Sequence, residues 1–357
     1  MNYKLLIPAL LLLGAAVYFF TQQYVTSTQV RRTTSQVSPT TLSQDQPDIA
    51  TQPDEKIPFE ELTIPYLRQR TYTSQLAPLQ QLSQNSGFTS YLTSYDSDGL
   101  RINGLLTQPA GEMPPGGWPA IVFIHGYIPP AEYRTQEKYV EHVNGLARSG
   151  FVVFKIDLRG HGSSEGEASG AYYSSDYVID ALNAYAALEV AEFVNPSRIG
   201  MWGHSMAGNV ALRAAVSKKN LPATVTWAGA VYSYQDFMDY GIDDGSYQPP
   251  RPDSPRVSYR QRLTETYGAF TAQSEFWQSV APTNYLSDFT GAVQIDHAVN
   301  DNVVSVEYSR NLGRLLSEAG IVHKLHEYQS GGHNISGSAF SSAMQRTVEF
   351  FRVHLSE

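Results

Sequence analysis

The eight residues 201–208, with the sequence MWGHSMAG, decide which fold this chain adopts. They come close to the pattern G-x-S-x-G, in which a sharp turn between a strand and a helix exposes a nucleophilic serine. Gly203 and Ser205 match the pattern, but Ala207 stands where a second glycine is expected and Gly208 follows one residue later. The serine is therefore either a nucleophile or part of an inert helix cap.

The backbone requirements of such a turn favour the nucleophile. A serine held in a strained conformation needs small neighbours, because the turn is tight and packs closely. Gly203 supplies the first small residue, and Ala207 adds one methyl group where the following helix begins and backbone angles are ordinary. Gly208 leaves room for the helix to pack against the strand. The sequence thus predicts an elbow with Ser205 at its tip.

Short β-rich segments alternate with amphipathic helical segments through most of the chain. The predicted strands cover residues 91–97, 100–108, 120–124, 151–156, 199–202, 225–231, 292–295 and 321–327. The predicted helices cover residues 133–148, 175–190, 206–216, 305–319 and 338–354. The first two strands flank an Asp-Gly turn, which is typical of an antiparallel hairpin. The pattern predicts an α/β fold with an eight-stranded, mostly parallel sheet covered by helices on both faces.

Polar residues follow the predicted strands at the edge of the sheet where doubly wound folds bind ligands. Ser205 follows one strand, Asp296 and Asp301 follow a later one, and His333 comes after the last. The order serine, acid, histidine is that of an α/β-hydrolase triad. We favour Asp301 as the acid because it lies in the loop, whereas the alternative, Asp296, stands at the end of the strand itself.

Residues 91–354 resemble an α/β-hydrolase of the prolyl-oligopeptidase-like group of serine hydrolases. The resemblance is carried by NPSRIG at 195–200 running into Gly203-His204-Ser205, by DLRGHG at 157–162, and by Asp98-Gly99-Leu100 with Gly104. The chain departs from the group at His297-Ala298, where histidine-glycine is usual, and at Ser305, where proline is frequent. The segment before residue 91 is too short for a propeller domain, so the resemblance covers the catalytic domain only.

The predicted chemistry assigns one role to each site residue. Ser205 attacks a carbonyl carbon, His333 takes its proton and later protonates the leaving group, and Asp301 orients the imidazole. The backbone N–H of Met206, at the start of a helix, and that of Tyr127 are expected to form the oxyanion hole. By resemblance, Tyr127 could instead use its hydroxyl group.

The resemblance implies a serine hydrolase that forms an acyl-enzyme on peptide or ester bonds, without a cofactor. A prolyl-oligopeptidase-like serine peptidase is the first interpretation and a carboxylesterase acting on small acyl esters is the alternative. A second alternative is an inactive, membrane-tethered binding domain, although no member of the triad is missing. The sequence leaves the oligomeric state open.

The segment 232–283 is too long for one crossover helix and is rich in aromatic residues and proline. We expect it to form a cap over the serine, which favours a small ester or a short peptide as substrate. Its composition shows no basic cluster that would select an acidic substrate. The hydrolase domain is expected to span residues 57–357.

The N-terminal residues differ from the rest of the chain. Residues 1–22 contain a charge-free apolar run and predict a membrane anchor or signal segment, and residues 23–56 read as a flexible Thr/Gln/Ser/Pro-rich linker. We expect an anchored protein with its catalytic domain on the exported side, periplasmic or extracellular, or a secreted one if the segment is cleaved.

Composition and charge exclude several classes of function. The formal net charge of −9 and the lack of a basic cluster argue against a nucleic-acid partner. The chain has no cysteine, so disulfides, thiolate metal sites and a cysteine nucleophile are excluded. His323 and His326 point to opposite faces of a predicted strand, which argues against a metal site there.

A fractionation experiment tests the N-terminal prediction. The full-length protein should remain with membranes, whereas a protein beginning at Ile57 should be soluble and retain its hydrolase activity. A full-length product that is shortened by about 16 to 28 residues and free in the exported fraction would instead indicate a cleaved signal peptide.

Overall fold

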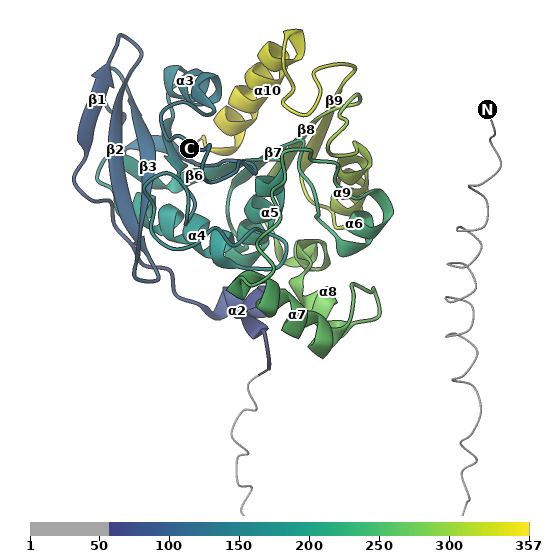
Figure 1. Ribbon diagram of the computed structural model, residues 1–357. Helices are drawn as coiled ribbons and strands as arrows, with labels where there is room; N and C mark the ends of the chain where they lie inside the picture. The colour runs from purple at the N-terminus through teal and green to yellow at the C-terminus, as the bar shows by residue number, and fades with distance from the viewer. Residues whose placement is uncertain (1–56, 357) are drawn as a thin grey trace, which may run out of the picture. The chain divides into compact units, whose positions relative to one another are not determined.

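The computed structural model describes residues 57–356 and contains a nine-stranded sheet. In spatial order the strands are β1 (Gln80–Gln84), β2 (Phe88–Ser97), β3 (Leu100–Pro109), β5 (Val152–Ile156), β4 (Trp118–Ile124), β6 (Val194–His204), β7 (Ala223–Trp227), β8 (Ala292–Ala298) and β9 (His323–Tyr328) (Figure 1). The strands from β5 to β9 in this order pair in parallel, and β1 to β3 are antiparallel. The predicted mostly parallel sheet is confirmed.

The sheet has one strand more than the eight predicted. The additional strand, β1, lies at the edge and pairs with β2, and its sequence QQLSQ is largely exposed. Only Leu82 is partly buried and the other four residues are polar and exposed, so the sequence shows no apolar alternation that would distinguish it from a loop. The strand predicted at 225–231 ends earlier, at Trp227, because Ala228 adopts a positive φ of 46° and the chain leaves the sheet.

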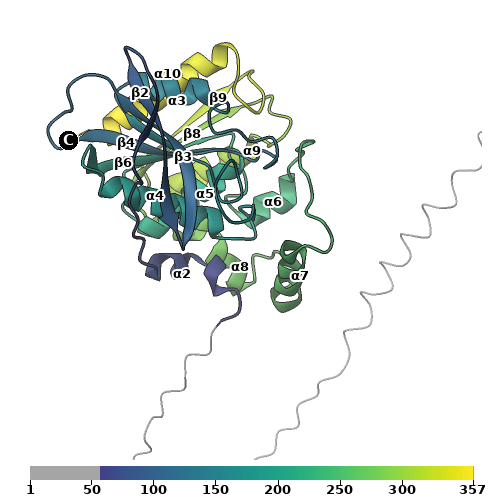
Figure 2. The same ribbon diagram turned by 60° about the vertical axis from the view of Figure 1, so that its left-hand side comes forward.

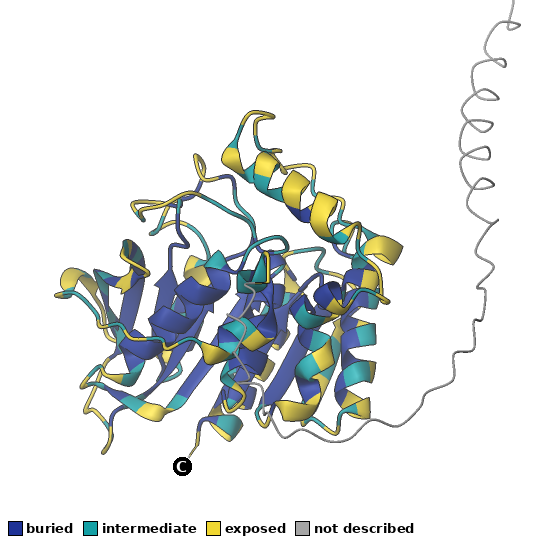
Figure 3. Cartoon of the chain, turned by 90° about the horizontal axis from the view of Figure 1, so that it is seen from below, coloured by how far each residue is buried: buried dark blue, intermediate teal, exposed yellow. Residues whose placement is uncertain are grey.

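Helices cover both faces of the sheet and enclose two hydrophobic cores (Figures 1 and 2). On one face lie α3 (Val140–Arg148) and α10 (Ser338–His354), which contact each other, and on the other lie α4 (Asp176–Glu189), α5 (Met206–Lys218) and α9 (Glu307–Glu318). Buried residues follow the strands and the inner sides of these helices, while exposed residues lie on outer helix faces and loops (Figure 3). The sheet therefore holds the loops at its edge on a rigid support.

The long connection between β7 and β8 folds into short helices. They are α6 (Tyr234–Tyr240), α7 (Pro255–Tyr267), α8 (Glu275–Val280) and the 3-10 helix η2 (Pro282–Asp288). Six aromatic residues of this insertion pack against one another, for example Tyr234 on Phe270 with ring centroids 4.2 Å apart. The helix α8 also contacts α2 (Ile64–Gln69), which follows the 3-10 helix η1 (Glu60–Leu62). The insertion is thus a packed part of the domain.

A buried ion pair ties the turn after β5 to helix α4. The guanidinium of Arg159 donates to the fully buried carboxylate of Asp180 at 2.7 Å and also reaches Asp176 at 3.0 Å. From β2, the hydroxyl of Ser97 donates to Asp180 Oδ1 at 2.7 Å and that of Tyr95 to its backbone carbonyl at 2.8 Å. One carboxylate therefore joins three elements.

The predicted membrane segment and the linker after it lie outside the described residues. Within residues 57–356, none of the helices combines the length and the apolar character that spanning a bilayer requires.

Replacing Asp180 tests this junction. The change Asp180→Ala leaves the buried charge of Arg159 without its main partner, and we expect the free energy of unfolding to fall by about 3–5 kcal/mol. Urea unfolding followed by circular dichroism measures the change. The matched control is Glu318→Ala, which breaks an exposed pair with Arg314 and should leave stability unchanged. Equal effects of the two changes would contradict the role given to Asp180.

Candidate active site

Ser205 lies at the tip of a strained turn between β6 and α5. Its backbone angles are φ 54° and ψ −121°, a conformation that L-residues rarely adopt. The N–H of Ser205 donates to the carbonyl of Trp227 at 2.9 Å, which holds the turn to the neighbouring strand. The half-buried serine is thus placed at the carboxyl edge of the sheet by the backbone itself.

Close packing at the turn explains the pattern of small residues. A Cβ atom on Gly203 would lie 2.3 Å from the carbonyl oxygen of Ala207, and one on Gly208 would lie 2.7 Å from the Cα of Gly229. Both approaches are shorter than any side chain tolerates. Glycine is therefore required at 203 and 208, whereas the methyl group of Ala207 is accommodated in the core.

Ser205, His333 and Asp301 lie in one hydrogen-bonded chain. The hydroxyl of Ser205 lies 2.9 Å from Nε2 of His333, and Nδ1 of His333 lies 2.8 Å from Oδ2 of Asp301. Because a carboxylate only accepts, Nδ1 carries the hydrogen and Nε2 is free to accept the serine proton. The arrangement can activate the serine for attack on an acyl carbon.

Asp301 is held as a carboxylate by four hydrogen bonds. Its Oδ1 accepts from the backbone N–H groups of Val303 and Val304, at 2.8 and 3.0 Å. Its Oδ2 accepts from His333 and from Nε2 of His297, the latter at 3.2 Å. Burial alone would raise the pKa of Asp301, but these donors outweigh it and hold the pKa well below its ordinary value. The group therefore stays charged opposite the imidazole.

Asp296, the alternative acid, lies in a different environment. It is fully buried in β8, where its carboxyl group accepts from the hydroxyl of Tyr328 at 2.6 Å and from the side-chain amide of Gln294 at 2.7 Å. Burial raises the pKa of Asp296 to about 7 despite these donors. Since its oxygens bond to residues other than His333, the structure brings Asp301, and not Asp296, to the histidine.

His297 is a neighbour of the triad that the sequence analysis did not place in the site. Its Nε2 faces two acceptors, Asp301 Oδ2 and the carbonyl of Val304 at 3.0 Å, so this nitrogen carries the hydrogen. Its Nδ1 accepts from the hydroxyl of Ser309 at 2.6 Å. The fully buried ring thus donates to the same carboxylate oxygen of Asp301 that accepts from His333. The departure His297-Ala298 from the usual histidine-glycine was the one available signal.

A second support joins the base to the loop after β4. Nε2 of His204 donates to the carbonyl of His333 at 2.9 Å, and its Nδ1 accepts from the hydroxyl of Tyr139 at 2.8 Å. The oxygen of Tyr139 in turn accepts from the N–H of Gly126 at 3.0 Å. Burial and the neighbouring imidazole of His333 lower the pKa of His204 to about 3, so its ring is neutral as this chain requires. Sequence alone does not reveal these contacts, because they join residues far apart along the chain.

The two residues predicted for the oxyanion hole lie at the ends of elements next to Ser205. Met206 is the first residue of α5, and the first N–H groups of a helix have no acceptor within it. Tyr127 lies three residues beyond β4, and its hydroxyl accepts from the N–H of Gln248 in the insertion at 3.0 Å. Backbone and hydroxyl donation by Tyr127 both remain predictions.

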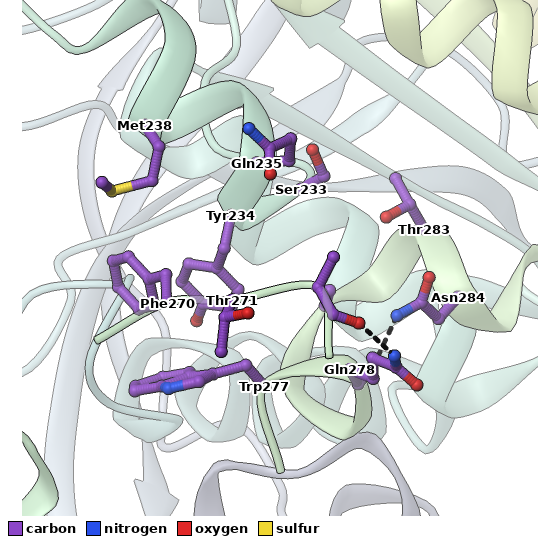
Figure 4. Close-up of a pocket in the computed structure, with 12 residues that line it drawn as sticks. Ser233, Tyr234, Gln235, Met238, Phe270, Thr271, Trp277, Gln278, Thr283 and Asn284 are labelled. Atoms are coloured by element: carbon purple, nitrogen blue, oxygen red, sulfur yellow. Dashed lines mark hydrogen bonds between the residues drawn. The ribbon is translucent and has the colours of Figure 1, made fainter. Parts of the chain in front are cut away.

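A cavity of about 180 Å³ lies within the insertion, away from the triad. It is bounded by aromatic rings and amide side chains, among them Tyr234, Phe270, Trp277 and Gln278, and no triad residue lines it (Figure 4).

Within residues 57–356 the structure has no group of three or more histidine, aspartate or glutamate side chains arranged to hold a metal ion.

Exchanging each acid for its amide distinguishes the two carboxylates. Asp301→Asn should lower kcat about 10⁴-fold, because the amide cannot stabilise the correct imidazole tautomer and its cation. Asp296→Asn, the matched control, should leave kcat close to the wild-type value because Asp296 does not touch His333. Steady-state kinetics with an activated ester measures both. The opposite ranking of the two variants would overturn the assignment.

Comparison with known proteins agrees with the fold and with the hydrolase character. Residues 119–239 match the family described as serine aminopeptidase, S33. The uncharacterized peptidase YtmA of Bacillus subtilis is 24% identical over 233 residues, which are 64% of this chain and 79% of that protein.

Solved structures with the same fold include both esterases and peptidases. An acetyl xylan esterase from Paenibacillus sp. R4 superposes with a TM-score of 0.57 at 20% identity, covering 80% of this chain and 91% of that one. The acylaminoacyl peptidase of Pyrococcus horikoshii gives a TM-score of 0.55 at 20% identity, covering 76% of this chain and 42% of that one. At this identity the likeness shows the fold alone. The resemblance to the catalytic domain of such enzymes is confirmed: the chain has the α/β-hydrolase fold, and the family match over residues 119–239 with its peptidase and esterase neighbours supports a serine hydrolase enzyme.

Proposed function

We propose that the protein hydrolyses short peptides through an acyl-enzyme formed on Ser205. The observation that carries this proposal is the hydrogen-bonded chain from Ser205 through His333 to Asp301, with the serine on a strained elbow at the edge of the sheet. An inert helix cap does not require the serine to face an imidazole that is itself fixed by a buried carboxylate.

The reaction follows from the donors and acceptors of the three residues. His333 Nε2 accepts the proton of Ser205 as the oxygen attacks the acyl carbon, and the resulting imidazolium faces the carboxylate of Asp301. The imidazolium then protonates the leaving amine or alcohol, which departs and leaves the acyl group on Ser205. Water then gives a proton to His333 as its oxygen attacks the acyl carbon, and His333 returns that proton to the oxygen of Ser205 as the bond to the serine breaks and the acid departs. Atoms and charges balance in both steps without any cofactor.

The negative charge on the acyl oxygen needs fixed donors during both steps. The N–H of Met206 lies next to the nucleophile and belongs to the free first turn of α5, where the helix dipole also favours negative charge. We assign the second donor to the N–H of Tyr127, whose ring is held by Tyr247, 5.6 Å away between centroids. The hydroxyl of Tyr127 is the alternative second donor.

The insertion supports a small substrate. Two of its backbone N–H groups donate to the loops of the site: that of Gln248 to the hydroxyl of Tyr127 at 3.0 Å, and that of Asp243 to the carbonyl of Val303, in the loop that carries Asp301, at 2.9 Å. A segment tethered on both sides of the triad restricts access by folded proteins more than access by short chains. The match to a serine aminopeptidase family also favours a peptide with a free amino terminus.

Acidic residues near the start of the insertion could attract such an amino terminus, but several already have local partners. Asp244 accepts from the N–H and the hydroxyl of Ser246, and Asp236 accepts from the side chain of Asn311 at 2.7 Å. Asp243 is the acidic residue whose backbone N–H donates to the loop that carries Asp301. We therefore assign recognition of a substrate ammonium group to Asp243 rather than to Asp236 or Asp244.

A carboxylesterase is the second candidate. The chemistry at Ser205 is the same for an ester, whose alcohol is the easier leaving group. The acetyl xylan esterase named above matches this chain over 91% of its own length, so it is comparable in size, whereas the acylaminoacyl peptidase is matched over 42%.

We also propose that the N-terminal segment anchors this activity to a membrane, with the domain on the exported side.

A labelling experiment combined with a substrate panel tests the proposal. A fluorophosphonate should modify Ser205 in the folded wild-type protein, and Ser205→Ala should lose the label and about 10⁶-fold in kcat while unfolding at the same temperature. Hydrolysis of one amide is then compared with a free and an acetylated amino terminus, in wild type and in Asp243→Asn, beside the corresponding ester.

The outcomes separate the candidates. A preference for the free amino terminus that Asp243→Asn removes supports the peptidase. Turnover of the ester with neither amide cleaved leaves the carboxylesterase. Absence of labelling and of any turnover by folded protein would indicate an inactive binding domain.

A further inference from the structure

A cavity of about 530 Å³ separates helix α7 from the segment that follows β5 and from α2. None of the triad residues lines it, so it is distinct from the active site described above. The side chains that line it include Arg256 and Arg260, one turn apart on α7, and Ser169 from the segment after β5. The composition of the insertion predicted no basic cluster, but the helix places these two arginines on one side.

Neither arginine is paired with a carboxylate in the part of the chain that the structure describes. Within residues 57–356 neither forms an ion pair: Arg256 donates to the carbonyl of Ala168 at 3.2 Å, and Arg260 lies over the ring of Tyr173 at 4.5 Å. The Nε atoms of both are shielded from solvent and have no acceptor among these residues. Burial, and next the charge of Arg260, lower the pKa of Arg256. The two guanidinium groups therefore repel each other, and burial adds to the cost of the charge on Arg256.

The carboxylates of the same cavity do not relieve this repulsion. Three of the four are engaged with other partners, and the fourth, Glu167, is exposed. Asp98 pairs with Arg70 at 2.5 Å, Asp176 pairs with Arg159 at 3.0 Å, and Glu61 accepts from the neutral hydroxyl of Tyr259 at 2.9 Å. Within residues 57–356 none of the four carboxylates forms an ion pair with Arg256 or Arg260. A separate anion is the group that the two arginines lack.

The position of Arg256 is built into the backbone around it. A Cβ atom on Gly170, which has a φ of +83°, would lie 2.4 Å from Nη2 of Arg256. The guanidinium thus occupies space that only a glycine leaves open. Close by, the hydroxyl of Ser169 is buried and has no hydrogen-bond partner among the described residues. A hydroxyl donor beside two guanidinium groups is a donor set suited to an oxyanion.

We propose that Arg256, Arg260 and Ser169 form a binding site for a divalent oxyanion of the phosphate class, either free phosphate or the phosphate monoester group of a larger molecule. Two guanidinium groups match two negative charges, and their planar forks match the spacing of phosphate oxygens. A singly charged carboxylate would neutralise one of the two. The site does not depend on the function assigned to Ser205.

Thermal unfolding of the full-length protein in detergent tests the site. Inorganic phosphate or glycerol phosphate is titrated at constant ionic strength with sodium chloride, and acetate serves as the monovalent comparison. The midpoint temperature should rise and saturate with either phosphate, equally in wild type and in Ser205→Ala, and should not respond to acetate. A stronger response to glycerol phosphate identifies the monoester as the ligand, and equal responses identify free phosphate.

Variants locate the effect. Arg256→Gln and Arg260→Gln should each weaken phosphate binding at least about tenfold, because a charge-assisted hydrogen bond is lost. The matched control is Arg251→Gln, which removes the same charge from an exposed arginine of the same insertion and should bind as wild type does. If either variant fails to fold, titration calorimetry of wild type with phosphate and acetate decides the question. A non-saturating or acetate-equal response of wild type, or unchanged binding by both variants, overturns the proposal.

Discussion

The positive φ of Ser205 is the constraint on which the rest of the site depends. A residue in this conformation survives only where its surroundings hold it, and here β6, α5 and β7 approach so closely that glycine is required at 203 and 208. The same contact makes the N–H of Ser205 donate to Trp227 at the end of β7. Because β8 pairs with β7, the loop that carries Asp301 is placed by the same packing. The nucleophile and its acid therefore derive their positions from one crowded junction.

Two aspartates five residues apart show how strongly surroundings decide the role of a carboxyl group. Asp296 is enclosed in the sheet with two neutral donors, and burial raises its pKa to about 7. Asp301 has backbone N–H groups on one oxygen and two imidazoles on the other, and its pKa falls well below the ordinary value. The environment of Asp296 favours the protonated, neutral carboxyl group, whereas that of Asp301 favours the charged carboxylate. A carboxylate that stays charged stabilises the imidazolium as it forms.

Much of the fold and of the triad could be predicted because the signals are local. Apolar strands alternating with helices determine the sheet, and the small residues around Ser205 determine the elbow. The edge strand β1 escaped prediction because its polar residues face solvent, and the end of β7 because a positive φ at Ala228 has no signature in alanine. The contacts of His204, Tyr139 and His297 could not be predicted, since they depend on which side chains meet after folding.

The hydrogen bond from His204 to the carbonyl of His333 has a mechanical consequence. His204 and Ser205 are consecutive residues at the end of β6, so the strand that carries the nucleophile is also hydrogen-bonded to the loop that carries the base. A displacement of β6 moves both partners together, and the separation between serine oxygen and imidazole nitrogen is preserved to first order. The distance between the oxygen of Ser205 and the imidazole of His333 is therefore maintained when β6 moves. Small movements of the sheet or a rearrangement of the insertion can then change access to the site without changing the alignment of these two residues.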